Sequence, residues 1–91
     1  MRIEGIIWLD AIVEKLEHKH RVSMSEVEEV LSGAARCRYV ERGSRRGEDV
    51  YAAIGKTHAG RSLIVFFVHK PRTHEALVIN ARRPGKRERN P

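Results

Sequence analysis

Apolar residues recur at two different spacings along this 91-residue chain, and the change divides it into a helical first third and a β-rich remainder. The short apolar run over residues 3–8 predicts a first strand. Apolar residues three and four positions apart then predict a helix over residues 9–20. We expect this helix to end in the basic stretch 18–21, because positive charge there suits the negative end of the helix dipole.

A second helix is expected to begin almost at once, because two serines are each followed three residues later by a glutamate. Both pairs, Ser23 with Glu26 and Ser25 with Glu28, offer a capping box, in which the serine accepts from a free N–H and the glutamate reaches back. The sequence leaves open which pair is used. Gly33 provides the stop.

From residue 36 onward the pattern becomes that of short strands separated by turns. The expected strands are 36–41, 49–56, 62–69 and 75–81, with a glycine- and arginine-rich loop over 42–47 between the first two. The expected order is therefore βααββββ followed by a basic tail. We predict a single α+β domain over residues 1–91, with two N-terminal helices packed on a mainly antiparallel sheet of four or five strands.

The turns between the last three strands decide which side chains share a face of the sheet. If both turns contain an even number of residues, Lys56 lies opposite Arg61, and Leu63 lies opposite Arg82. Asn80 then joins the three cations on one face. Like charges on neighbouring strands repel one another, so this cluster favours a bound phosphate. Two alternatives stay open: the long side chains extend into water, or an odd-numbered turn separates the cluster.

The same register places Glu48 opposite His69, about 26 Å from Arg61 along the strand. This pair is either a base with its orienting partner or a plain cross-strand polar contact. The five histidines of the chain have no cysteine or paired carboxylate at ligand spacing, so we expect neither a metal nor another cofactor. Phe66 lies inside an apolar strand, and no base-stacking surface is expected.

Charge is distributed unevenly and points to the class of partner. Residues 1–31 carry four Lys and Arg against seven Asp and Glu, whereas residues 32–91 carry fourteen against five. The net charge of +6 therefore comes from the β-rich part, and most visibly from the strand and tail over 75–89. A strand that leads directly into such a basic segment favours a polyanion as partner.

Composition also limits the compartment. The longest apolar run, 63–68, is far shorter than the roughly 20 residues that cross a bilayer, and we expect neither membrane insertion nor export. Cys37 is the only cysteine and cannot form an intramolecular disulfide, which favours a reducing, cytoplasmic location.

Short motifs in a shared order and spacing resemble those of the BrnT family of type II toxins, over nearly the whole chain. They are Ile7-Trp8-Leu9-Asp10, Lys15, Lys19-His20-Arg21-Val22-Ser23, Glu26, Val30-Leu31, Gly47-Glu48, Ile54-Gly55, Gly60-Arg61, Ile79-Asn80-Ala81-Arg82-Arg83 and Glu88-Arg89. The chain departs from the family pattern at Arg21, where glycine is usual, and at Asn80, where serine is usual. Pro84-Gly85 also interrupts what is commonly a tail helix, and the chain stops at Pro91 before the usual tyrosine.

The resemblance implies a RelE-like fold and an RNA-cleaving toxin that arrests translation and is silenced by an antitoxin, usually a ribbon-helix-helix DNA-binding protein. Metal-independent RNA cleavage needs a base, an acid and cations around the phosphorane. The residues that we expect to take these roles are Arg61 and Arg82 as clamps, Lys56 as an assisting cation, and His69 and Glu88 as base or acid. Those expected to hold the RNA backbone are Lys19, His20, Arg83, Lys86 and Arg87.

Two other functions remain open on the sequence alone. One is a basic module that binds nucleic acid without cutting it, and the other is a protein that only binds an antitoxin-like peptide. Turnover of RNA separates the first from a nuclease, because a binding module leaves the strands intact.

Overall fold

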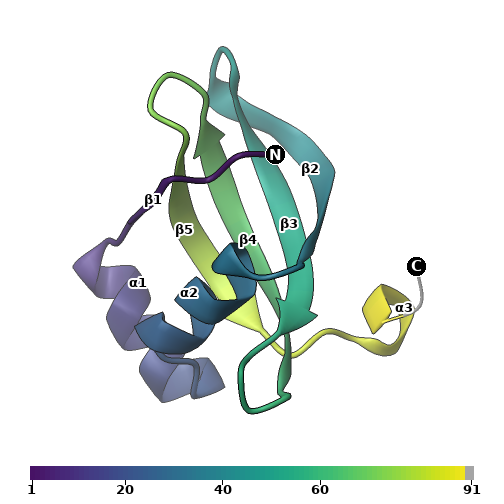
Figure 1. Cartoon of the computed structure of the whole chain (residues 1–91). Helices are drawn as coiled ribbons and strands as arrows, with labels where there is room; N and C mark the ends of the chain where they lie inside the picture. The colour runs from purple at the N-terminus through teal and green to yellow at the C-terminus, as the bar shows by residue number, and fades with distance from the viewer. Residues whose placement is uncertain (90–91) are drawn as a thin grey trace.

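The structure is a computed structural model, and it describes residues 1–89 of the chain. Its elements, shown in Figure 1, follow the predicted order βααββββ, with a short helix in the basic tail. They are β1 (Gly5–Ile7), α1 (Asp10–Lys15), the π-helical turn η1 (Leu16–His20), α2 (Met24–Ser32), β2 (Arg36–Arg45), β3 (Glu48–Lys56), β4 (Ser62–Lys70), β5 (Glu75–Arg82) and α3 (Lys86–Arg89).

All five strands belong to one sheet, in the order β1-β5-β4-β3-β2. β1 runs parallel to β5, and the other neighbouring strands are antiparallel. The helices α1, η1 and α2 form a layer over one side of this sheet (Figure 1). The predicted α+β architecture, with two N-terminal helices on a mainly antiparallel sheet, is therefore confirmed.

The core lies between the helical layer and the sheet. The buried residues that meet there are Leu16, Val22, Val27 and Val30 from the helical layer, and Ala53, Leu63, Val65, Phe67, Ala76, Val78 and Ala81 from the sheet. Because side chains alternate along a strand, these residues define the helix-facing side. Their neighbours along β3, β4 and β5 point the other way, onto what we call the open face.

The first predicted helix is divided in two. α1 passes into η1, which ends at Arg21 in the left-handed conformation, with φ of 53°. A left-handed residue is least strained when it is glycine, which is usual at this position in the family that the sequence resembles. Of the two possible capping boxes, the one formed by Ser23 and Glu26 is used. Ser23 accepts from the Glu26 N–H at 3.2 Å, and Glu26 accepts from the Ser23 N–H at 3.1 Å.

The predicted register is wrong in the first hairpin. Lys56 pairs with Ser62, so the turn spans residues 57–61 and contains an odd number of residues. It closes through a 2.9 Å hydrogen bond from the Thr57 N–H to the Arg61 carbonyl, and Gly60 adopts a positive φ of 89°. Lys56 therefore does not lie opposite Arg61.

The second hairpin has the predicted even turn over residues 71–74, but its register changes farther along. Phe67 pairs with Val78 whereas Phe66 pairs with Asn80, so Ile79 forms a bulge. As a result Arg82 lies opposite Ile64, and not opposite the predicted Leu63. Together the two shifts leave Lys56 and Arg82 on the same face and move Arg61 to the other.

Two further observations complete the fold. β2 continues to Arg45, so most of the loop predicted over 42–47 belongs to a long, irregular strand with register shifts between Tyr39 and Arg45. No helix within residues 1–89 combines the length and apolar character needed to cross a membrane.

Candidate nucleic-acid interface

Two rows of paired residues cross the open face near the end where β5 leaves the sheet. One row is Arg36, Ile54, Ile64 and Arg82, and the next is Arg38, Ala52, Phe66 and Asn80. Lys56 pairs with Ser62 just beyond the first row. Residues paired across strands point to the same face, so Arg36, Arg38, Lys56 and Arg82 share the open face. We call these four residues the open-face cluster.

Arg82 has the most defined geometry in this cluster. Its guanidinium donates to both carboxylate oxygens of Glu88, at 2.8 and 3.0 Å, and to the carbonyl of Arg83 at 3.1 Å. It also lies over the ring of Phe66, 5.3 Å from the ring centroid. A guanidinium held over an aromatic face and bound in a forked manner presents its donors in a fixed direction.

Glu88 reaches Arg82 from α3 because the tail turns back after Pro84. Its carboxylate also accepts from the Gly85 N–H at 2.6 Å. The hydrogen bonds from Arg82 and Gly85, with the positive charges of Arg82 and Arg38, outweigh desolvation and lower the pKa of Glu88 to about 2. The same ion pair raises the pKa of Arg82. Glu88 is therefore ionised at neutral pH and is a weak base.

Arg36 and Arg38 are members of the cluster that were not predicted from the sequence, and the contact of Phe66 with Arg82 was not predicted either. In the part of the chain that the structure describes, neither arginine has an acidic partner within ion-pair distance. Arg36 and Arg38 are two apart in a strand, and this alternation was a usable signal for a shared face. Whether Arg36 and Arg38 point to the open face or to the helix-facing side depends on how β2 pairs with β3. The sequence did not define that pairing.

Arg61 does not converge with Arg82, and this central expectation of the sequence analysis is wrong. Its guanidinium turns toward the helical layer, where it donates to the carbonyls of His20 and Arg21 at 3.1 and 2.7 Å. It also donates to both oxygens of Glu26, at 3.1 and 3.2 Å. The cause is the odd-numbered turn, which gives Arg61 the opposite orientation to Lys56. Both terminal nitrogens, Nη1 and Nη2, are thus engaged within the protein.

His69 also lies away from the cluster. It belongs to the helix-facing side of β4, where its ring meets Tyr51 edge-on at 6.1 Å. The predicted pairing of Glu48 with His69 is wrong, because Glu48 accepts from the Lys70 ammonium at 3.0 Å. Of the residues named as base or acid, only Glu88 lies beside Arg82.

The residues predicted to hold RNA divide into two groups. Arg83, Lys86 and Arg87 are exposed and lie in the tail that follows Arg82. Lys19 and His20 lie at the end of η1, in the helical layer. Because Arg61 links the β3–β4 turn to His20, both groups lie near the same end of the sheet.

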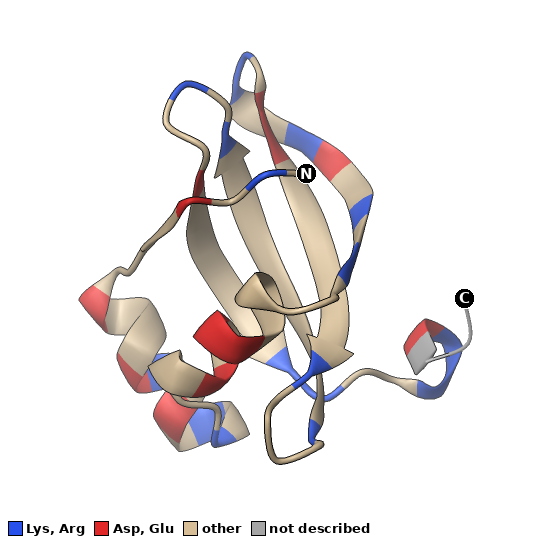
Figure 2. Cartoon of the chain, viewed as in Figure 1, with Lys and Arg blue, Asp and Glu red and all other residues tan. Residues whose placement is uncertain are grey.

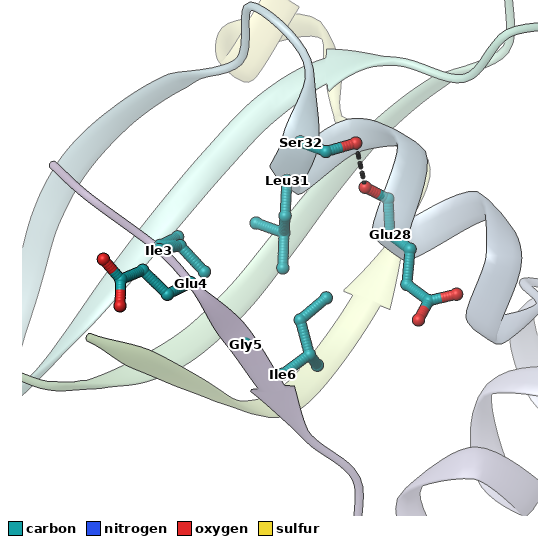
Figure 3. A pocket seen from close by; sticks show the side chains of 7 residues that line it. All are labelled: Ile3, Glu4, Gly5, Ile6, Glu28, Leu31 and Ser32. Atoms are coloured by element: carbon teal, nitrogen blue, oxygen red, sulfur yellow. Dashed lines mark hydrogen bonds between the residues drawn. The ribbon is translucent and has the colours of Figure 1, made fainter. Parts of the chain in front are cut away.

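Figure 2 shows how charge follows the layers. Most acidic positions on the ribbon lie along the α1–α2 layer, which also carries some basic ones, and most basic positions lie at the strand ends, on β2 and on the tail. A hollow of about 280 Å³ lies between β1 and the end of α2, as shown in Figure 3. None of the side chains that line it is basic. It is lined by Ile3, Glu4, Gly5, Ile6, Glu28, Leu31 and Ser32. The hollow therefore does not suit an anionic ligand, whereas the open face does.

Comparison with known proteins gave a structural likeness. No protein-family model matches the sequence, and no curated protein sequence shows significant similarity to it. Among solved structures, the crystal structure of the ribonuclease toxin BrnT from Brucella abortus is similar, with a TM-score of 0.64 and 21% sequence identity. The match covers 90% of this chain and 97% of that chain. The two proteins therefore share a fold over nearly their whole length.

Proposed function

We propose that this chain is a ribonuclease toxin of the BrnT family, which cleaves RNA and inhibits translation until a cognate antitoxin neutralises it. One observation carries the proposal: the fold of a known ribonuclease toxin occurs here together with a cluster of four cations on the open face of the sheet. The motif over residues 79–83, which resembles that family, contributes Arg82 to this cluster and places Asn80 on the same face.

The chemistry of the cluster suits electrostatic stabilisation of the reaction. Attack by a ribose 2′-hydroxyl on the neighbouring phosphate creates a phosphorane that carries additional negative charge. Arg82 is the member of the cluster with defined forked geometry, and we assign it the role of binding the phosphorane. Lys56 shares the face and assists as a second cation. Arg61 serves the fold instead.

The rest of the basic surface would hold the RNA backbone. Arg83, Lys86 and Arg87 extend the cluster along the tail, and their exposed side chains would contact phosphates on one side of the cleavage point. Lys19 and His20, near the same end of the molecule, would contact the strand farther along. These contacts position the RNA and carry no sequence information of their own.

The family resemblance also names the partner. We expect an antitoxin, in the usual case a ribbon-helix-helix DNA-binding protein, to form a complex with this chain in the cytoplasm. No metal or other cofactor enters the proposed chemistry.

The proposal is tested by incubating the purified protein with total RNA beside its Arg82→Ala variant. Removing one preorganised donor of this kind costs about 2.7 to 4 kcal/mol of barrier, so we expect cleavage to fall about 100- to 1,000-fold while the fold stays intact. Arg72→Ala is the matched control, because Arg72 is exposed in the β4–β5 turn at the opposite end of the sheet. Full cleavage by Arg82→Ala would contradict the assignment.

A second function, binding of nucleic acid without cleavage, is favoured by one observation. His69, the only strand histidine among residues 1–89, lies on the helix-facing side, and the low pKa of Glu88 makes its carboxylate a weak base. A binding module would show steeply salt-dependent affinity for RNA and leave the strands intact after long incubation. Product strands from the wild type, absent with Arg82→Ala, would decide for the nuclease.

A further inference from the structure

The contact between Arg82 and Glu88 has the geometry of a bound phosphate. Two guanidinium N–H groups point at two oxygens of one anion, at 2.8 and 3.0 Å. Arginine binds carboxylates and phosphates through the same forked arrangement, so either group fits the site. The anion present in the structure is supplied by the chain's own tail.

A second arginine on the same face of the sheet acts on this carboxylate through its charge, without a direct ion pair. Arg38 belongs to β2, three strands away from β5, and its positive charge contributes to the low pKa of Glu88. Arg38 lies in the same cross-strand row as Phe66, and Phe66 carries the guanidinium of Arg82 on its ring. An anion at the position of Glu88 is therefore stabilised by the positive charges of Arg82 and Arg38, and Arg82 itself lies over the ring of Phe66.

The element that carries Glu88 is weakly attached. α3 has four residues and follows Pro84-Gly85, a segment that breaks any continuous helix from β5. Pro84 is buried, but Gly85, Lys86 and Arg87 are exposed. Among the contacts that the structure describes, the carboxylate of Glu88 supplies the side-chain hydrogen bonds that attach α3 to the sheet. A competing anion therefore has these bonds to displace.

We propose that Arg82 and Arg38 form a phosphate-binding site, that Glu88 occupies it in the free protein, and that RNA binds by exchanging one of its phosphates for this carboxylate. The identity of the phosphate as part of RNA rests on the proposed function. The tail then competes with RNA for the same site. Only molecules in which Glu88 is undocked can bind the phosphate, so the apparent affinity for RNA equals the intrinsic affinity multiplied by the undocked fraction.

The test compares Glu88→Gln with Glu14→Gln, which removes the same charge from an exposed position on α1. The probe is a 2′-O-methyl RNA oligonucleotide, which cannot be cleaved because it lacks the attacking hydroxyl. A partly exposed ion pair such as Arg82–Glu88 contributes little free energy, so it lowers the affinity for RNA only by a small factor. We therefore expect Glu88→Gln to bind the oligonucleotide about 3- to 10-fold more tightly than the wild type, as measured by fluorescence anisotropy. Glu14→Gln should change affinity less than about twofold.

The same substitution in an Arg82→Ala background shows whether the effect passes through Arg82. We expect no gain there beyond that of Glu14→Gln, because the competitor no longer has a site to occupy. A gain that persists without Arg82, or an equal gain from both glutamate substitutions, would overturn the proposal and leave only a general effect of charge.

A readout without RNA separates this site from the proposed function. In ¹⁵N NMR spectra of the arginine side chains, sodium pyrophosphate should shift the Arg82 Nε–H signal at a lower concentration in Glu88→Gln than in the wild type. If it does and no RNA is cleaved, the phosphate site stands and the nuclease proposal fails. If pyrophosphate leaves Arg82 unaffected in Glu88→Gln, the site is refuted even when the wild type cleaves RNA.

Discussion

The guanidinium of Arg61 binds both carboxylate oxygens of Glu26, at 3.1 and 3.2 Å, across 35 positions of sequence. Through its bonds to the carbonyls of His20 and Arg21 it also connects the β3–β4 turn to the junction between η1 and α2. Burial opposes ionisation of Glu26, but hydrogen bonds from the Ser23 backbone and Arg61 outweigh it and lower its pKa. Arg61 therefore holds the helical layer to the sheet.

We predict that Arg61→Ala lowers the free energy of unfolding by about 2 kcal/mol, because it leaves Glu26 and two carbonyls without their charged donor. Arg61→Lys should recover less than half of this loss, since one ammonium cannot reach the Glu26 carboxylate and the carbonyls of His20 and Arg21 together. Urea unfolding followed by circular dichroism measures both. Lys56→Ala, at an exposed neighbouring position, is the control and should stay within about 0.5 kcal/mol of the wild type.

A second prediction concerns Arg21, whose φ of 53° is unfavourable for a side chain with a Cβ. Arg21→Gly should raise the free energy of unfolding by roughly 0.5 to 1 kcal/mol, the relief of strain being partly offset by the greater freedom of glycine in the unfolded chain. Arg21→Ala keeps the Cβ and should not stabilise the protein. Equal stability of the glycine and alanine variants would show that the conformation carries no cost.

The third prediction tests Arg38, which only the structure places in the cluster. Each phosphate contact with single-stranded nucleic acid adds about 0.7 to the slope of log affinity against log salt. Arg38→Ala should therefore reduce that slope by about this amount in titrations with the uncleavable RNA. Arg46→Ala, in the exposed turn between β2 and β3, should leave the slope unchanged. The reverse pattern would place the RNA at the other end of the sheet.

The fourth prediction is a pH dependence of the tail contact. The pKa of Glu88 falls from 4.5 to about 2 when α3 is docked, so docking is favoured fully above about pH 4.5 and is lost as the pH falls toward 2. A ¹³C NMR titration of the Glu88 carboxyl should show its midpoint near the lower value in the wild type, and a higher midpoint, shifted toward 4.5, in Arg82→Ala. A wild-type midpoint near 4.5 would mean that the carboxylate is free in solution.

Local signals predicted the elements well. The Ser23 and Glu26 pair and Gly33 lie within a few residues of the ends they define, and α2 begins and ends as these residues indicate. The order of strands likewise followed from runs of apolar residues bounded by turns. The passage from α1 into η1 carried no recognised signal, although the left-handed Arg21 stands where the family that the sequence resembles usually has glycine.

The register of the sheet could not be obtained in the same way. It depends on the conformation of the 57–61 turn and on a bulge at Ile79, and neither is marked by residue type. A single additional residue in the first turn and a single bulged residue in β5 change the register of the two hairpins. As a result Lys56 and Arg82 share the open face, whereas the Arg61 side chain contacts the helical layer. The position of Glu88 was equally hidden, because the path of the tail is decided by the ion pair that it forms.

β2 lies at the edge of the sheet, with one row of backbone N–H and C=O groups that no strand within residues 1–89 covers. An edge strand of this kind can pair with a strand of another molecule, and the exposed side chains of Tyr39 and Val40 would favour that pairing. The arginines along β2 oppose this addition through repulsion between copies. They are Arg36, Arg38, Arg42 and Arg45. The charges to which we assign RNA binding in the proposed function would thus also keep the molecules apart, and a variant without them is expected to aggregate more readily.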